Sequence, residues 1–254
     1  MNAKHGLAGA LVALALLPGL TRAQAPVAGT LPTAQALVAR SVDALGGRTA
    51  IEQLPARWES NRIEIPAQGL TIAVQMFISG NRIVTLSEMP GLGTIRSGFD
   101  GEVGWAINPA MGPQLLDGTQ LQQARQSADP LAVLHPERYV ASMQTVEETD
   151  FGGARCYRVR VTTPWGETYD EFFNKETGLP QGSVRRQASP QGDLEITAQI
   201  EEYRTLAGVR LPRVVRAEMM GMQIINRVDS TDLRAIPDSV FALPPEVRAL
   251  RPPR

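Results

Sequence analysis

Few residues of this chain could act as a nucleophile or bind a metal ion. Beyond its first 25 residues the 254-residue sequence contains one histidine, His135, and one cysteine, Cys156. These two could form a thiolate–imidazole pair, but the sequence has no G-x-S-x-G elbow and no glycine-rich nucleotide-binding loop. One cysteine and one histidine are too few ligands for a structural zinc site. We therefore expect no catalytic residue, no metal site and no cofactor.

Adjacent acidic residues recur along the chain and could act as a general acid and a general base. The pairs are Glu147-Glu148, Asp170-Glu171 and Glu201-Glu202. Each pair lies in a segment with strand-like alternation, and neighbouring residues of a strand point to opposite faces of the sheet. The two carboxylates of a pair therefore do not converge, and we interpret them as solvated charges at strand edges.

The stretch FDGEVGWAINP, residues 99–109, places an acid on each side of Gly101 and a tryptophan soon after. It could hold two catalytic carboxylates beside a substrate-stacking ring. Asp-Gly between two apolar runs is, however, typical of a tight hairpin turn. We favour the turn, which puts Val103, Trp105 and Ile107 on one face of the strand that follows.

The first 25 residues have the layout of a secretory signal peptide. Lys4 precedes an apolar run over 6–17, and the tripeptide Ala-Gln-Ala at 23–25 forms a cleavage site. The apolar run is shorter than a membrane span requires, and the alternative is an uncleaved N-terminal anchor. We expect a soluble, exported, periplasmic protein that begins near Pro26.

The charge of the remaining chain is nearly balanced. Without the first 25 residues, 229 residues remain, with 23 basic and 26 acidic side chains and a net charge of −3. This balance gives no reason to expect nucleic acid as a partner. A single cysteine also allows no internal disulfide, so the fold must depend on its hydrophobic core.

The residues after the signal segment predict one mainly β domain, from 26 to 250. Apolar spacing predicts a helix over 34–45, and alternation of period two then predicts about eleven strands joined by tight turns. Residues 109–136 interrupt the strands and predict a short helical insertion with a helix over 120–127. So many antiparallel strands must curl into a strongly curved, half-open barrel. The N-terminal helix and the insertion would cover its concave apolar face.

The order of motifs resembles that of a family of bacterial envelope proteins. The residues 99–101 with Trp105, the run 174–180 and the closing run 236–246 are similar to features of the lipoprotein carriers LolA and LolB and of other outer-membrane lipoprotein-sorting-like proteins. The resemblance implies a divergent member of this family, with an incomplete antiparallel barrel. It also implies that helices cover an apolar cavity that holds a lipid or lipoprotein acyl chains.

We expect a periplasmic carrier or binding protein for a hydrophobic ligand, with the envelope membrane or lipoprotein-export components as further partners. The alternatives are an accessory module of the cell envelope with a dry core, and a periplasmic hydrolase. The expected cavity lining is apolar and includes methionines, whose flexible side chains suit varied apolar ligands. Its residues are Ile72, Val74, Met76, Val103, Trp105, Ile107, Leu115, Leu116, Leu121, Leu131, Met222 and Ile224.

The signal-peptide interpretation has a direct test. We expect the exported protein to begin at Pro26, because signal peptidase cleaves after a small residue such as Ala25. N-terminal sequencing of the protein from the periplasmic fraction measures this. An intact Met1 on membrane-bound protein would contradict the interpretation, since that outcome requires an uncleaved anchor.

Overall fold

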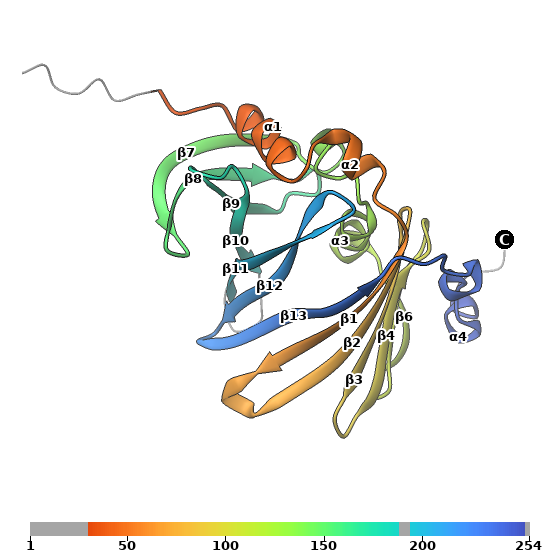
Figure 1. Cartoon of the computed structure of the whole chain (residues 1–254). Helices are drawn as coiled ribbons and strands as arrows, with labels where there is room; N and C mark the ends of the chain where they lie inside the picture. The colour runs from red at the N-terminus through yellow and green to blue at the C-terminus, as the bar shows by residue number, and fades with distance from the viewer. Residues whose placement is uncertain (1–29, 188–193, 252–254) are drawn as a thin grey trace, which may run out of the picture. The chain divides into compact units, whose positions relative to one another are not determined.

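A thirteen-stranded antiparallel sheet dominates the computed structural model, which describes residues 30–187 and 194–251 of the chain (Figure 1). The expected signal segment and its cleavage site lie outside the described residues. The strands are β1 (Arg57–Ile65), β2 (Leu70–Ser79), β3 (Arg82–Met89), β4 (Gly93–Phe99), β5 (Gly104–Asn108), β6 (Gly112–Leu115), β7 (Ser142–Phe151), β8 (Ala154–Thr162), β9 (Thr168–Asn174), β10 (Pro180–Gln187), β11 (Leu194–Leu206), β12 (Val209–Met219) and β13 (Met222–Asp232). The α-helices are α1 (Ala34–Ala44), α2 (Arg48–Glu52), α3 (Gly118–Ala128) and α4 (Pro245–Arg248), and the 3-10 helices are η1 (Pro66–Gln68), η2 (Pro136–Arg138) and η3 (Asp238–Phe241). None of the helices in the described ranges combines the length and the hydrophobicity that a membrane crossing requires.

The sheet is open, and its two end strands are consecutive in the sequence. The strand order is β6-β5-β4-β3-β2-β1-β13-β12-β11-β10-β9-β8-β7. The predicted half-open antiparallel barrel is therefore confirmed. The described part of the chain has thirteen strands rather than about eleven, because the residues Arg57–Ile65 and Gly112–Leu115 also join the sheet.

The insertion crosses the opening between the two free edges. It occupies 116–141, a shorter range than expected, because β6 uses the preceding residues. At one end Leu121 of α3 lies against Gly104 of β5. At the other end the Gln123 amide donates to the Glu167 carboxylate in the turn between β8 and β9, at 3.3 Å. The insertion thus connects the two halves of the sheet over the concave face.

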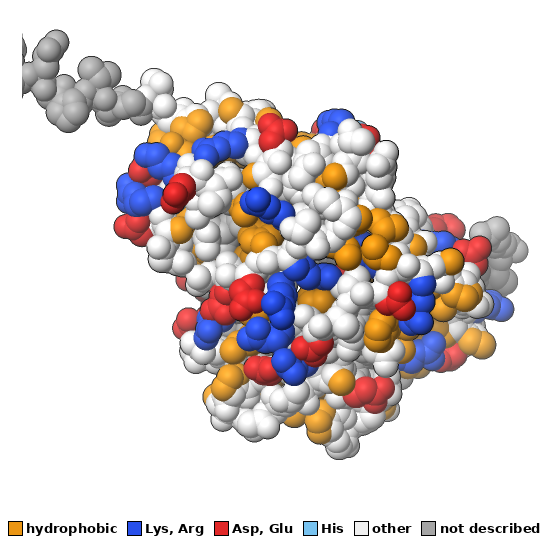
Figure 2. Space-filling model, viewed as in Figure 1, with side chains coloured by type: hydrophobic (Ala, Val, Ile, Leu, Met, Phe, Trp, Pro, Cys, Tyr) orange, Lys and Arg blue, Asp and Glu red, His pale blue; other side chains and the backbone are white. Residues whose placement is uncertain are grey.

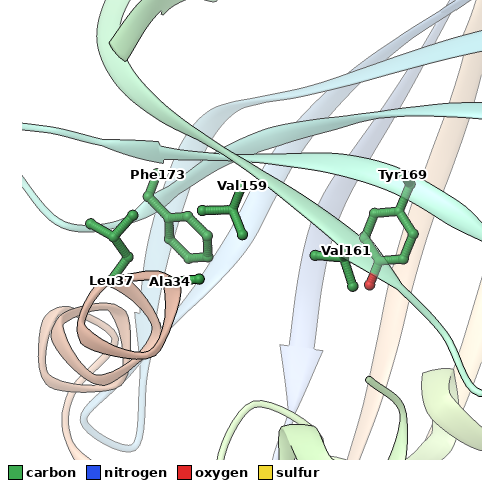
Figure 3. Packing of buried hydrophobic residues seen from close by; sticks show 6 residues of the cluster. All are labelled: Ala34, Leu37, Val159, Val161, Tyr169 and Phe173. Atoms are coloured by element: carbon green, nitrogen blue, oxygen red, sulfur yellow. The ribbon is translucent and has the colours of Figure 1, made fainter. Parts of the chain in front are cut away.

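The helix α1 covers another part of the concave face, as predicted. Ala34 and Leu37 are buried against Val159 of β8 and Phe173 of β9 (Figure 3). Apolar residues at three-residue spacing along α1 produce this contact, because they fall on one side of a helix. Burial of such side chains contributes about 1.5–3 kcal/mol each for the larger ones, so this helix is held by the sheet rather than by its own propensity.

The C-terminal segment covers the opposite face of the sheet, which the sequence did not predict. The helices η3 and α4 pack over β3–β6, where Phe241 and Val247 bury Trp105 until it is only 1% exposed. The ring lies against Gly98 of the neighbouring strand, where an added Cβ would come within 2.9 Å of the indole. A glycine at this position gives the tryptophan the space it occupies.

The stretch at 99–109 forms a turn followed by a strand, as favoured from its sequence. The Asp100 carboxylate accepts hydrogen bonds from the amides of Glu102 and Val103, at 2.9 and 2.7 Å. Gly101 has a φ of +107°, a conformation that larger residues rarely adopt. Both acids therefore lie in a turn, and the carboxylate of Asp100 is used to hold it.

Charged side chains from β1, β11, β12 and β13 pair with one another at the surface. Arg227 pairs with Glu202, and Arg62 pairs with Asp229. Figure 2 shows basic and acidic side chains together across the middle of the visible face, over β12 and β13 of Figure 1. Exposed ion pairs contribute about 0–1 kcal/mol each, so the sheet depends mainly on its buried apolar residues.

We expect Gly98→Ala to lower the free energy of unfolding by about 1–3 kcal/mol, because the new methyl group would collide with Trp105 and with the Ile83 carbonyl. Urea unfolding followed by circular dichroism measures this. The neighbouring change Ser97→Ala is the matched control and should stay within about 0.5 kcal/mol of the parent protein. Equal stabilities of the two variants would contradict the close approach of the ring.

Candidate functional site

Apolar side chains from successive strands lie on one concave face of the sheet. Ile63 of β1 is paired with Ile72 of β2, and at the other side of the sheet Val161 of β8 is paired with Tyr169 of β9. The residues between them along each strand point the other way. The concave face therefore offers an apolar surface that the helices must cover.

A cavity of about 440 Å³ lies between this face and its cover. The helix α1 contributes Val38 to its wall, the insertion contributes Ala132 and Val133, and the strands β8–β12 contribute side chains such as Ile200 and Val215. The volume falls within the range of roughly 300–1,000 Å³ that small-molecule sites occupy. This cavity, which we call the apolar cavity, is the candidate functional site.

Different segments of the chain cover different parts of the apolar cavity. Figure 3 shows Phe173 and Val159 pointing at α1, so direct packing closes the sheet there. Val161 and Tyr169 lie farther along the strands and away from α1 in the same view. Gln126 of α3 joins the lining of the cavity together with these residues.

Glu171 of β9 brings a carboxyl group into the apolar lining. It lies between Tyr169 and Phe173 on the strand and opposite Ser183 of β10. The side chain is half-buried because it faces the cavity, and it forms no hydrogen bond or ion pair with any described residue. Desolvation by the surrounding protein raises the pKa of this carboxyl, and the positive charge of Arg185 offsets part of that effect.

Arg185 does not pair with Glu171 because its guanidinium is held elsewhere. Its Nη1 donates to the Glu167 carboxylate at 3.1 Å, and its Cζ lies 3.8 Å from the centre of the Tyr169 ring. Glu167 also accepts from the indole N–H of Trp165 at 3.2 Å. The positive charge therefore reaches Glu171 only through space.

Ser41 is a second polar group of the apolar cavity that lacks a partner. It lies within α1, is 0% exposed, and its hydroxyl forms no hydrogen bond with the described residues. A serine inside a helix can bond to the carbonyl oxygen four residues earlier, but Ser41 does not. An unpaired buried hydroxyl costs free energy, which a polar group in the cavity could recover.

A second pocket of about 420 Å³ shares Tyr139 with the apolar cavity. Its lining is more polar and includes Arg57, Asp129 and Arg138. These groups are already paired: Arg138 donates to the Asp129 carboxylate at 3.0 Å, the Tyr139 hydroxyl donates to it at 2.9 Å, and Arg57 pairs with Glu59 at 2.8 Å. The second pocket also contains the Arg125 guanidinium and is the more polar of the two, so the apolar cavity is the better candidate for a hydrophobic ligand.

The structure divides the expected cavity residues between the two faces of the sheet. Those that the strand register places on the concave face are Ile72, Val74, Met76, Met222 and Ile224. Leu116 and Leu121 lie against Gly104 from the insertion side, and Leu131 lines the second pocket. None of the twelve lines the apolar cavity, whose strand residues come from β7–β12, so their role in binding stays a prediction.

The prediction that Trp105, Ile107 and Leu115 share the concave face with Ile72 is wrong. They lie on the opposite face, under the C-terminal segment, and do not share a face with Ile72. Val103 lies in the turn before β5 rather than on the strand. The alternation within each strand was correct, but the alignment between β2 and β5 depends on the register of β3 and β4, which the sequence pattern does not contain.

The structure does not bring Cys156 and His135 together. Cys156 is fully buried in β8 beside the Phe151 carbonyl, and burial raises the pKa of its thiol. The His135 Nδ1 lies 3.1 Å from the Glu137 carboxylate. Within the described ranges, no three or more His, Cys, Asp or Glu residues are arranged to hold a metal ion.

The predicted divergence of the adjacent acids is confirmed at Asp170-Glu171. Asp170 faces away from the cavity and pairs with Arg160 at 2.7 Å, whereas Glu171 faces the cavity. The expectation that both are solvated charges is wrong for Glu171. Alternation itself explains this, because it turns one acid of each pair toward the concave face.

Solved structures that are similar to this chain include the following three. A LolA superfamily protein from Nitrosomonas europaea is 17% identical, with a TM-score of 0.57, and the match covers 84% of this chain and 99% of the other. A DUF1329 family protein from Desulfovibrio piger is 12% identical, with a TM-score of 0.57 and coverage of 82% and 96%. A domain named as an outer membrane lipoprotein-sorting protein, from Vibrio parahaemolyticus, is 10% identical, with a TM-score of 0.53 and coverage of 80% and 97%.

The sequence itself matches no protein-family model and no curated protein. The likeness is therefore one of fold, and the fold is LolA-like, as the resemblance implied.

Glu171→Gln should make the protein more stable at about pH 8, because desolvation makes ionisation of Glu171 costlier in the folded parent than in the unfolded chain. The folded state raises the pKa of Glu171 and so binds its proton more tightly than the unfolded chain. The parent therefore recovers this stability as the pH falls, and the gap between the two proteins should close by about pH 4. Urea titrations across this range measure the gap.

The exposed pair partner Glu195 provides the control, since Glu195→Gln removes a carboxylate that is not desolvated. A gap at Glu171 that does not change with pH would contradict a desolvation cost at this residue.

Proposed function

We propose that this LolA-like fold serves as a periplasmic carrier or binding protein for a hydrophobic ligand, a lipid or a lipoprotein acyl chain. The observation that carries the proposal is the apolar cavity of about 440 Å³ beneath α1 and the insertion. The LolA superfamily protein and the lipoprotein-sorting domain share this fold and support a carrier-like role. The envelope membrane or lipoprotein-export components are the proposed donors and acceptors of the ligand.

The insertion is the part of the cover that we propose to open. Its helix α3 has eleven residues, and isolated helices of this length are only marginally stable, so it depends on packing. The strands beneath it are hydrogen-bonded to neighbours on both sides, except at β6 and β7. A ligand could therefore enter when the insertion moves, without loss of strand pairing.

A second candidate is an accessory module of the cell envelope with a dry core. The observation that favours it is the free edge of β7, a ten-residue strand that ends the sheet. A free edge can pair with an extended segment of another protein. The next experiment separates this candidate from the carrier.

Ala198→Phe places a large ring in the apolar cavity, which Ala198 lines. If the cavity accepts ligands, the variant should fold with little loss of stability and bind a neutral hydrophobic probe, N-phenyl-1-naphthylamine, at least about tenfold more weakly. Fluorescence titration measures the affinity. In a dry, well-packed core the same change would cost about 1–3 kcal/mol, and the parent would not bind the probe.

Ala73→Phe is the matched control, because Ala73 is exposed on β2 and points away from the concave face. It should bind the probe as the parent does. Equal weakening in both variants would show that the probe does not occupy the apolar cavity.

A further inference from the structure

The carboxyl group of Glu171 is, with the Ser41 hydroxyl, one of two polar groups of the apolar cavity that have no hydrogen-bond partner among the described residues. Most of the lining offers only carbon, and the described residues supply no hydrogen bond to this carboxyl. A buried polar group without a partner costs free energy, and the cost is larger when the group is charged. Glu171 is half-buried and faces the cavity, so a hydrogen-bond donor on a bound molecule would satisfy it there.

The groups around Glu171 restrict what that molecule can be. Arg185 from β10 is held by Glu167 and the Tyr169 ring, so it does not neutralise Glu171 by direct contact. The other titratable side chains among the described lining residues are Tyr139 from the insertion and Tyr169 from β9. Burial raises the pKa of each to about 12, so both hydroxyls remain protonated and uncharged at ordinary pH.

We propose that the apolar cavity selects aliphatic ligands whose buried polar group donates a hydrogen bond, and disfavours those that end in a carboxylate. The inference rests on the proposed function and adds the class of its ligand. A hydroxyl, amide or amine donates to Glu171 whether that carboxyl is protonated or charged. The free hydroxyl of Ser41, which lines the same cavity from α1, can donate a hydrogen bond to a ligand oxygen or accept one from a further N–H of the ligand.

A carboxylate ligand is disfavoured at Glu171. It has no proton to donate to an ionised Glu171, and a second negative charge beside that carboxylate is repelled in a medium of low dielectric constant. The cations that could attract it line the second pocket, where Arg138 and Arg57 are paired with acids and Arg125 forms no ion pair with a described residue. Binding of an anion there is the alternative outcome of the test.

The test uses four aliphatic probes of one chain length, which displace N-phenyl-1-naphthylamine from the full chain at about pH 8. Tetradecanol and tetradecylamine donate hydrogen bonds, methyl myristate does not, and myristate carries a carboxylate. We expect the two donors to bind at least about tenfold more tightly than myristate, the difference typical of one hydrogen bond to a charged group. The affinity for methyl myristate should lie between that for the two donors and that for myristate.

Glu171→Gln should reduce the ratio of the affinities for tetradecylamine and myristate by at least about fivefold, because the amide removes the charge and also offers a hydrogen-bond donor. Glu195→Gln changes an exposed residue, serves as the control and should leave this ratio of affinities unchanged. If Glu171→Gln fails to fold, the order of the four affinities for the parent protein still tests the proposed ligand selectivity.

The outcomes separate the two proposals. Equal binding of all four probes, or tightest binding of myristate, would overturn the inference while the carrier function stands. If the parent binds neither the naphthylamine nor any of the four probes, the proposed function fails and the inference fails with it.

Discussion

The pairing of β1 with β13 is the interaction on which the rest of the structure depends. It runs from Trp58 opposite Asp232 to Glu64 opposite Ile225, and it joins the two meanders β2–β6 and β7–β12 into one sheet. Because the first and last strands meet in the middle, the free edges are β6 and β7. These strands are consecutive in the chain, so the segment between them must cross the open side of the barrel.

Buried charges stabilise this register. Glu59 of β1 is 6% exposed and accepts from Arg57 at 2.8 Å and from Arg204 of β11 at 2.6 Å. Arg204 also donates to Thr231 of β13, which is the strand partner of Glu59. Loss of one partner would leave a buried charge alone, whereas the intact group adds little net stability. The contacts therefore favour one alignment of three strands more than they strengthen the fold.

Most of the local structure could be predicted from the sequence, and the relations between distant strands could not. The turn at Asp100-Gly101 and the helix α1 follow from short-range patterns, and both are confirmed. The face that Trp105 occupies depends on three intervening strand registers and on the C-terminal segment that covers it, whose Phe241 comes 136 residues later in the chain (241 − 105). No short pattern around Trp105 contains that information.

The candidate site was missed for a different reason. Tyr169 and Phe173 alternate with Glu171, and this pattern already placed an acid on an apolar face. The interpretation of adjacent acids as solvated charges concealed it. A carboxyl group between two aromatic residues at spacing two is the sequence signal for a polar group inside a cavity.

Two of the three tryptophans lie at places where their fluorescence reports on separate parts of the protein. Trp105 is enclosed by the C-terminal segment, on the side of the sheet away from the apolar cavity. Trp165 donates to Glu167, which also accepts from Gln123 of α3, so its indole lies where the insertion meets the sheet. The emission of Trp165 therefore depends on the position of the insertion, and that of Trp105 on the attachment of the C-terminal segment. In variants that keep one tryptophan each, the emission of Trp165 and that of Trp105 would distinguish a movement over one face from a loosening of the other.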